Sequence, residues 1–451
     1  MASPEDAPDD AHLHDWPGVY ALSAGWALSF SVVTASITAT NLASSAFSPS
    51  SSWNTVPLAF LIVSLSAWSM ALPYVFAKLK GRLNTYRVTS CVGMLASTIA
   101  AIACAEKSFG ALCFSSLLFA LPAAAGQSFR FAVLTLVPLR SRPKCIGLVL
   151  TGGIVGAVIG PLYAAASKNM FASAPFAGVY LCTGVAFFLL LIILLVPGLV
   201  TFPSEGGGMG DASNQKTVET KDEESSTSSD TKTSSIAVSS AFKRFGFVSA
   251  VAIAALSYGA MSFLMSPTPL VMREDDKFSF DEVSHVILSH MLGMYAPSFG
   301  TGKSVAKFGW RPVAACGALL FIVSSVIMHD GTSMAHFAGG QCLLGIAWNL
   351  CFVAATSEVA KVSMEEAQAA GGSQIEKAKS AQKVQSAADV VTFAFAGAAS
   401  VGSGPALAKI EWKEMQIVGL MLAGLMFLFV KLAGIKDARK FVELNAGGDK
   451  V

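Results

Sequence analysis

Long apolar stretches alternate with short polar connectors along almost the whole chain, and this alternation predicts membrane-spanning helices. Each apolar stretch is close to the roughly 20 residues that an α-helix needs to cross a bilayer. Six fall in each half of the sequence, so the pattern predicts an all-α integral membrane protein with twelve transmembrane helices in two six-helix bundles. The predicted spans are 19–46, 54–78, 88–106, 109–137, 145–167, 172–199, 245–271, 281–302, 311–328, 334–360, 384–406 and 415–436.

One polar segment, residues 200–243, divides the two halves and is rich in Ser, Thr, Gly and acidic residues. Because such a segment has too little apolar surface to form a core, we expect a disordered linker between a bundle at 19–199 and a bundle at 244–436. Residues 1–18 are expected to be a disordered N-terminus, and 437–451 a tail. The whole chain is 53% hydrophobic and 13% charged, whereas soluble domains contain roughly 25% charged residues, which excludes a soluble fold.

The distribution of lysine and arginine predicts the orientation of the helices. If both termini face the cytoplasm, the inner connectors and the tail hold 24 of the 31 basic residues, and the outer connectors hold 6. The remaining one, Arg130, lies inside a predicted span. Because cytoplasmic connectors carry an excess of Lys and Arg, this asymmetry predicts cytoplasmic termini and a cytoplasmic linker.

This topology predicts the response of the linker to protease. In sealed right-side-out vesicles, protease added from outside is expected to leave residues 200–243 uncut, and cleavage is expected only after permeabilisation. Immunoblotting with a C-terminal tag measures the fragments. Cleavage of the linker in intact vesicles would show that the predicted orientation is wrong.

A short basic turn occurs once in each half. The stretch PYVFAKLKGRLNTYR runs from Pro73 through the end of the second span into the connector, and PSFGTGKSVAKFGWR runs from Pro297 through the end of the eighth span into the next connector. Lys78 in the first copy and Lys307 in the second are 229 residues apart, which is one half of the protein plus the linker. Internal duplication of six spans is typical of secondary transporters.

These features together resemble the major facilitator superfamily of membrane transporters. The second turn is similar to that family's loop motif, Gly-x-x-x-Asp-Arg-x-Gly-Arg, although the usual Asp is replaced by Ala306 here and by Ala77 in the first copy. The resemblance implies the superfamily fold and a gating role for this turn, without the charge pair that the aspartates supply. The matching positions are Gly302, Lys307, Gly309 and Arg311.

Two features of the first half extend the resemblance. The run from Gly152 to Pro161 resembles the glycine-proline motif of the fifth span, with glycines at 152, 156 and 160. Arg130 resembles the family's intramembrane arginine of the fourth span. Glycines four residues apart line one face of a helix, where another helix can approach closely. Within the superfamily, the segments SFRFAVL, SYGAMSFLMSPTPLVM, SHMLGMYAPSF and GIAWNLCFV are similar to a poorly characterised microbial-type branch.

Arg130 and Gln127 are the first candidates for a polar pathway. Arg130 lies seven residues before the predicted inner end of span four, or roughly 10 Å along the helix. A charge in hydrocarbon is costly, so Arg130 is expected to face a cavity and to meet an anionic solute or a carboxylate. The alternative is a side chain that extends to the lipid headgroups. Gln127, one turn earlier, shares its face.

His290 and Asp389 are candidates for proton coupling. His290 lies near the middle of span eight, and histidine titrates near physiological pH; a neutral histidine bonded to a neighbouring helix is the alternative. Asp389 lies about five residues into span eleven, and a pair with Arg130 would offset the cost of both charges. In the alternative, span eleven starts later and Asp389 lies at the surface.

Three further residues and two prolines mark polar or irregular places within spans. Asn41, Trp348 and Asn349 are candidates for contact with the solute, and hydrogen bonding between helices explains them equally well. Pro267 and Pro269 are expected to break span seven. Irregular backbone at this depth is tolerated where it lines a cavity.

The sequence therefore predicts a secondary active transporter of a small organic solute that works by alternating access, with proton coupling as a hypothesis. No phosphate-binding glycine loop, metal-ligand spacing or catalytic triad is found, so we expect no enzyme activity, cofactor or metal. The expected partners are the solute, protons and the lipid bilayer, with no nucleic acid, and the chain is expected to be a monomer. The alternatives are an uncoupled facilitative carrier and a transport-inactive sensor or scaffold. The sequence does not distinguish the plasma membrane from an organelle membrane.

Overall fold

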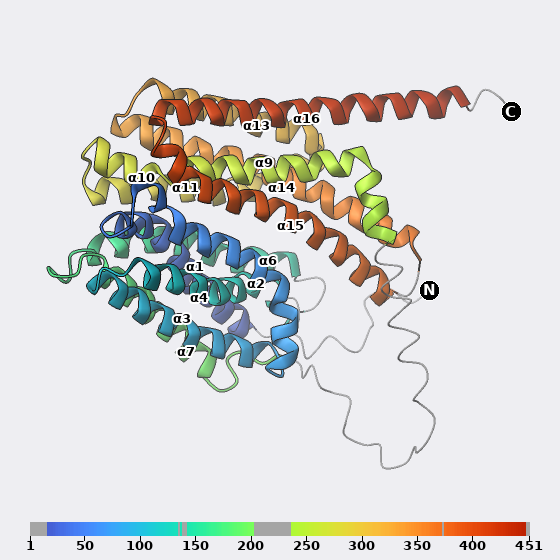
Figure 1. Ribbon diagram of the computed structural model, residues 1–451. Coiled ribbons are helices and arrows are strands. Elements are labelled where there is room, and N and C mark those ends of the chain that lie inside the picture. The colour runs from blue at the N-terminus through green and yellow to red at the C-terminus, as the bar shows by residue number, and fades with distance from the viewer. Residues whose placement is uncertain (1–15, 134–135, 138–141, 203–235, 372–373, 448–451) are drawn as a thin grey trace, which may run out of the picture. The chain divides into compact units, whose positions relative to one another are not determined.

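The computed structural model describes residues 16–133, 136–137, 142–202, 236–371 and 374–447 (Figure 1). Within these residues the chain forms helices and no strands. The elements of the first half are α1 (Trp16–Ser45), η1 (Ser51–Trp53), α2 (Val56–Lys78), α3 (Arg82–Ala105), α4 (Phe109–Gln127), α5 (Phe129–Ala132), α6 (Arg142–Ser167) and α7 (Ala177–Leu195).

The second half begins with α9 (Phe245–Met265), α10 (Thr268–Leu270) and the π-helical turn η4 (Val271–Asp275). It continues with α11 (Phe280–Tyr295), α12 (Ser298–Phe308), α13 (Trp310–Asp330), α14 (Met334–Ala369), α15 (Gln374–Leu407) and α16 (Trp412–Gly447). The expected break in span seven is confirmed, because α9 ends at Met265, just before Pro267 and Pro269.

Eleven helices in the described part of the chain are long and apolar enough to cross a membrane. They correspond to all the predicted spans except the eighth, 281–302. There the structure has α11 and α12, of 16 and 11 residues, so the prediction of a single helix at this place is wrong. The interruption falls at Pro297, whose nitrogen carries no hydrogen for the helical ladder.

The chain divides into two compact units that do not coincide with the two sequence halves. The first unit contains residues 1–209 together with 266–292, and the second contains 210–265 and 293–451. In the first unit α1 packs against α6, and α3 packs against α4 and α7. In the second, α13 packs against α14 and α16, and α9 packs against α14, α15 and α16. The segment with α10 and η4, from the second half of the sequence, thus belongs to the first unit.

Large apolar side chains remain exposed on the outward faces of many helices. On α16, Met421, Leu425 and Leu428 are 66%, 44% and 49% exposed. Exposed apolar surface of this kind marks contact with lipid or a partner. With eleven apolar helices, it shows a multi-pass membrane protein.

Two connectors contain more helix than the sequence analysis expected. Most of the predicted linker, 203–235, lies outside the described residues, but 236–243 is helical. The connector between spans ten and eleven is helical on both sides of residues 370–373, because α14 extends to Ala369 and α15 begins at Gln374. Arg244 joins the start of α9 to this extension through ion pairs to Glu365 (2.8 Å) and Glu366 (3.1 Å).

Candidate functional site

The fourth span ends earlier than predicted, and this changes the position of Arg130. The helix is interrupted at Ser128, whose hydroxyl donates to the carbonyl of Ala125 (2.6 Å) and also bonds to the hydroxyl of Tyr86 (2.8 Å). A serine that bonds to a nearby carbonyl competes with the helical ladder. Because α5 then ends at Ala132, Arg130 lies two residues from the end of the helix instead of seven.

Arg130 is exposed, and its guanidinium carbon lies 4.8 Å from the centroid of the Phe131 ring. Gln127, the last residue of α4, is half-buried. The expected basic connector that follows, 138–144, lies mostly outside the described residues.

Asn41 is fully buried on α1 and supports the break in span seven. Its side-chain nitrogen donates to the carbonyl of Ser266 at 2.5 Å, at the point where Pro267 cannot continue the helix. Its side-chain oxygen has no hydrogen-bond partner among the described residues. The structure therefore shows the hydrogen bond between helices that the sequence offered as the alternative for Asn41, and contact with the solute stays a prediction.

Asn349 has the same kind of role at the break between α11 and α12. Its side-chain nitrogen donates to the carbonyl of Met294 (2.8 Å) and to the hydroxyl of Ser298 (2.7 Å), on the two sides of Pro297. Its side-chain oxygen accepts from the hydroxyl of Thr301 at 2.6 Å. Asn349 therefore stabilises the broken helix, since it satisfies polar groups that the ladder leaves open.

His290 and Asp389 lie in very different surroundings. His290 is fully buried on α11, whereas Asp389 is exposed on α15. Because α15 begins at Gln374, Asp389 is preceded by several helical turns. Asp389 lies 18 residues before Leu407, where α15 ends. At 1.5 Å per residue, the length of helix from Asp389 to Leu407 is about 27 Å, which is close to the thickness of the hydrocarbon core. Its pairing with Arg130 stays a prediction from the sequence.

Trp348 belongs to a cluster of four aromatic rings within the second unit. The ring of Tyr258, on α9, lies 5.5 Å from Trp348, 5.7 Å from Phe352 and 5.4 Å from Phe393, between centroids and edge to face. Trp348 and Phe352 stack at 4.9 Å with an angle of 11° between their planes. The cluster therefore joins α9, α14 and α15.

The aromatic cluster is only partly buried, and one of its polar groups is free. Tyr258, Phe352 and Phe393 are half-buried, while Trp348 is 8% exposed. The indole nitrogen of Trp348 is buried and has no hydrogen-bond partner in the described residues. The half-buried rings around it form an apolar surface on which a flat aromatic molecule can stack.

The glycine run of α6 lies directly against α1. A Cβ atom at Gly152 would lie 2.1 Å from the carbonyl oxygen of Ser23, and one at Gly156 would lie 2.5 Å from that of Ala27. A Cβ at Gly160 would lie 2.4 Å from the carbonyl oxygen of Ser31. These distances leave no room for a side chain, so the glycines permit backbone contact between the helices. Pro161 follows inside α6.

Hydrogen bonds connect the same two helices. The hydroxyl of Thr34 donates to the carbonyl of Gly156 (3.1 Å), that of Ser23 to Leu148 (2.8 Å) and that of Tyr163 to Ser31 (3.1 Å). Small residues at the contact and hydroxyls across it are the usual means of helix association in membranes.

The two basic turns share an unusual backbone conformation. Gly81, which precedes α3, has φ 118° and ψ 168°, and Gly309, which precedes α13, has φ 83° and ψ 163°. Side chains strongly disfavour this region, so glycine is required at both places. The internal repeat seen in the sequence thus extends to the backbone of the turns.

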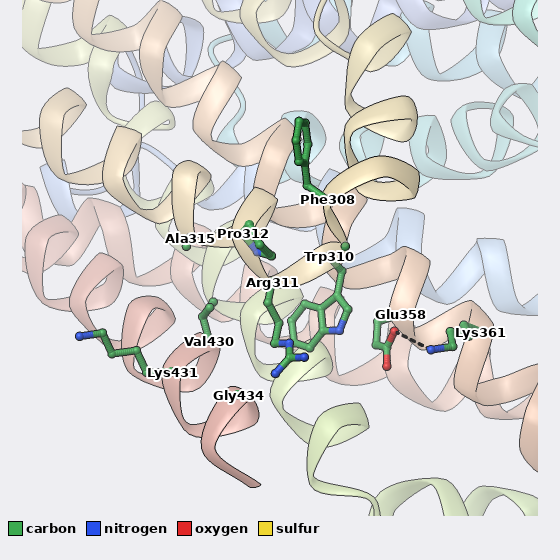
Figure 2. A pocket seen from close by; sticks show the side chains of 11 residues that line it. Phe308, Trp310, Arg311, Pro312, Ala315, Glu358, Lys361, Val430, Lys431 and Gly434 are labelled. Carbon is green, nitrogen blue, oxygen red and sulfur yellow. Dashed lines mark ion pairs between the residues drawn. The ribbon is translucent and has the colours of Figure 1, made fainter. Parts of the chain in front are cut away.

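Around the second turn the motif positions lie at the ends of several helices. Lys307 is the penultimate residue of α12, with its amine 5.0 Å from the ring centroid of Phe308. Gly302 is exposed on the same helix, and Arg311 lies in the first turn of α13. Figure 2 shows Arg311 beside a pocket lined by α13, α14 and α16.

No metal centre is found in the part of the chain that the structure describes, where no group of three His, Cys, Asp or Glu side chains is placed to hold an ion. None of the eight cysteines, all of which lie in the described part of the chain, forms a disulfide there.

These helices form the fold of the major facilitator superfamily of membrane transporters. The chain superposes on the crystal structure of the nucleoside transporter NupG with a TM-score of 0.65 at 13% identity, covering 92% of this chain and 98% of that one. A bacterial homologue of the human lysosomal transporter Spinster, in an inward-facing and unoccupied conformation, gives a TM-score of 0.60 at 15% identity, covering 92% and 94%.

Proteins with a similar sequence are named as transporters too. The riboflavin transporter RfnT of Brucella anthropi is 27% identical over 376 residues, 82% of this chain and 85% of the relative. YddS of Bacillus subtilis, an uncharacterised MFS-type transporter, is 27% identical over 279 residues, 59% of each chain. No family model matches the sequence. The resemblance drawn from the sequence is confirmed: the relatives and the solved structures with this fold are membrane transporters of the MFS type and not enzymes.

Sequence reasoning missed most of the aromatic cluster. Trp348 and Phe352 are four residues apart on one helix face, and this spacing was a signal that could have been used. Tyr258 and Phe393 lie far away in the sequence, and no local pattern brings them to Trp348.

Proposed function

We propose that the protein is a secondary transporter of a flat heteroaromatic solute, with riboflavin as the first candidate. The observation that carries this proposal is the similarity to RfnT, which extends over 82% of this chain and 85% of the relative. A relationship along nearly the whole length supports a common mode of transport more strongly than a match to one motif. The duplicated halves support alternating access.

The aromatic cluster supports the choice of solute. Stacking of a heteroaromatic base on an aromatic side chain contributes about 1–3 kcal/mol, and edge-to-face or offset arrangements are favoured. The half-buried rings of Tyr258, Phe352 and Phe393 present such surfaces, and the solute would stack on them. Trp348, which is 8% exposed and stacks on Phe352, would hold the cluster in place.

Proton coupling is part of the proposal and rests on His290 and Asp389. Histidine is the side chain whose ordinary titration range suits proton coupling, and His290 is fully buried on α11. A carboxylate on a transmembrane helix is a common element of proton relays. An inward proton gradient would then drive accumulation of the solute.

Uptake of radiolabelled riboflavin by proteoliposomes tests this proposal. We expect saturable uptake that increases when the outside is made acidic, and no comparable uptake of adenosine. Tyr258→Leu, by loss of stacking surface, and Trp348→Ala, by loss of the ring that packs against Tyr258 and Phe352, are each expected to reduce uptake at low substrate about tenfold. The matched control is Trp68→Ala, since Trp68 is an exposed tryptophan on α2, outside the cluster.

The other results would each change the proposal. Uptake that does not depend on the gradient would indicate a facilitative carrier. Riboflavin binding without flux would indicate a sensor or scaffold. Absence of both binding and flux would show that riboflavin is the wrong solute, and equal loss in the Trp68 variant would remove the role of the cluster.

A further inference from the structure

A cavity in the second unit, distinct from the aromatic cluster, lies between three long helices, at the start of α13 and beside inner turns of α14 and α16. It has a volume of about 610 Å³ and is formed by the turn before α13, the first residues of α13, the later part of α14 and the later part of α16 (Figure 2). The Lys and Arg distribution assigns these parts of the helices to the cytoplasmic side of the membrane. The cavity therefore lies where the headgroups of the inner leaflet are expected.

The cavity is lined by three cationic side chains from three different helices. Arg311 comes from α13, Lys361 from α14 and Lys431 from α16, and Glu358 is the one acidic residue of the lining. The amine of Lys361 lies 3.9 Å from a carboxylate oxygen of Glu358, which offsets one of the charges. The lining keeps an excess of positive charge, and this favours an anionic ligand.

Lys431 is available to such a ligand. Its amine lies 5.4 Å from the centroid of the Phe427 ring, and it forms no ion pair among the residues that the structure describes. Figure 2 shows the side chains of Lys431 and Arg311 on the two sides of Val430. The two cations come from separate helices.

Glycine keeps the cavity open next to Arg311. A Cβ atom at Gly434 would lie 3.3 Å from a terminal nitrogen of Arg311, so any larger residue would press on the guanidinium. Gly309, with its φ of 83°, forms the turn at the edge of the cavity. Trp310 and Phe308 add aromatic surface of the kind that lies at membrane interfaces.

The helices that form the cavity also expose apolar side chains next to it. On α16, Leu428 and Leu432 are 49% and 37% exposed and lie within one turn of Lys431. On α13, Leu319 is 54% exposed, one turn beyond Ala315 of the cavity lining. A phospholipid needs both parts, a cationic place for its phosphate and an apolar surface for its acyl chains.

We propose that this cavity binds the headgroup of an anionic phospholipid of the cytoplasmic leaflet, with Arg311 and Lys431 on the phosphate. Basic pockets between transmembrane helices on the cytoplasmic side suit such headgroups. A free phosphate would use the same cations but gain nothing from Leu319, Leu428 and Leu432. The proposal does not depend on which solute is transported.

Thermal unfolding of the purified full chain in detergent tests this site. Phosphatidylglycerol is expected to raise the unfolding temperature with increasing concentration, because a ligand that binds the folded state stabilises it. Phosphatidylcholine and inorganic phosphate at equal concentrations are expected to have little effect. The double variant Lys361→Gln with Lys431→Gln is expected to bind phosphatidylglycerol about 30-fold more weakly, from about fivefold for each cation near the membrane surface.

The matched control is the double variant Lys409→Gln with Lys413→Gln. Both of these lysines are exposed and lie near the opposite end of α16, and the charge change is the same. The control is expected to respond to phosphatidylglycerol as the unmodified chain does. If the first double variant does not fold, Lys431→Gln alone is expected to weaken binding about fivefold.

Three results would overturn the proposal. An equal response to phosphatidylcholine would mean that the charges are not used. An unchanged response in the Lys361 and Lys431 variants would place the lipid elsewhere. An inorganic phosphate response as large as that to phosphatidylglycerol would indicate a site for a free anion.

Discussion

Replacement of Arg130 by alanine is expected to reduce transport at least tenfold while the protein still inserts into the membrane. The side chain is exposed on α5, at the end of an apolar helix. In a bilayer, a guanidinium that faces lipid costs several kcal/mol. The favourable alternative is that it faces water and other charged groups along a pathway. Uptake by proteoliposomes, normalised to the amount of inserted protein, measures the effect.

The sequence hypothesis of a pair with Asp389 adds a sharper expectation. Asp389→Ala is expected to be as damaging as Arg130→Ala, and the exchange Arg130→Asp with Asp389→Arg is expected to restore part of the activity. The exchange retains the attraction and reverses its direction, so a structural pair tolerates it better than either single change. Lys413→Ala, which removes an exposed charge at the outer end of α16, serves as the control.

The results distinguish three roles for Arg130. Recovery in the exchange variant supports the pair. An inactive exchange variant together with an active Asp389→Asn supports an anionic solute at Arg130. Normal transport by both alanine variants would show that the two side chains extend to the headgroups and that the predicted pathway is wrong.

Substitution of Gly156 or Gly160 by alanine is expected to destabilise the folded protein. The added methyl group at Gly156 would lie 2.5 Å from the carbonyl oxygen of Ala27, and at Gly160 it would lie 2.0 Å from the hydroxyl oxygen of Thr34. The helices can accommodate it only by moving apart. Overpacking of this kind costs about 1–3 kcal/mol, and the hydrogen bond from Thr34 to Gly156 is expected to be lost as well. We expect a lower unfolding temperature in detergent and less folded protein in the membrane.

Gly147 provides a matched control on the same helix. A Cβ atom there has nothing within 4 Å, so Gly147→Ala is expected to leave the unfolding temperature unchanged or slightly raised. If Gly156→Ala and Gly147→Ala unfold at the same temperature, the close contact between α1 and α6 does not contribute to stability.

The sequence by itself determined the membrane class and the repeated architecture. An apolar run of about 20 residues has few alternatives to a membrane helix, because every backbone polar group must be bonded within the segment. Glycine positions were equally informative. Only glycine adopts the backbone of Gly81 and Gly309, and only glycine fits where α6 touches α1, so both features could be predicted from residue type.

The sequence also indicated where helices break, but not in full. Pro267 and Pro269 predicted the end of α9 at Met265 correctly. Pro297 interrupts the eighth span, yet Pro73 lies inside the continuous α2 and Pro161 inside α6. A proline removes one hydrogen-bond donor wherever it occurs, and whether the helix breaks depends on what other groups replace the missing bonds.

Only the tertiary structure decided the roles of the polar and aromatic residues within the spans. The sequence offered both solute contact and hydrogen bonding between helices for Asn41 and Asn349, and the structure shows that both hold carbonyl groups at helix breaks. Tyr258 and Trp348 are 90 positions apart in the sequence, and they meet because α9 packs against α14. Hydropathy predicts which residues lie in the membrane. Because a membrane helix is apolar on all its faces, hydropathy does not predict which face packs against another helix. Which faces meet, and hence which side chains form a site, depends on packing between helices distant in the chain.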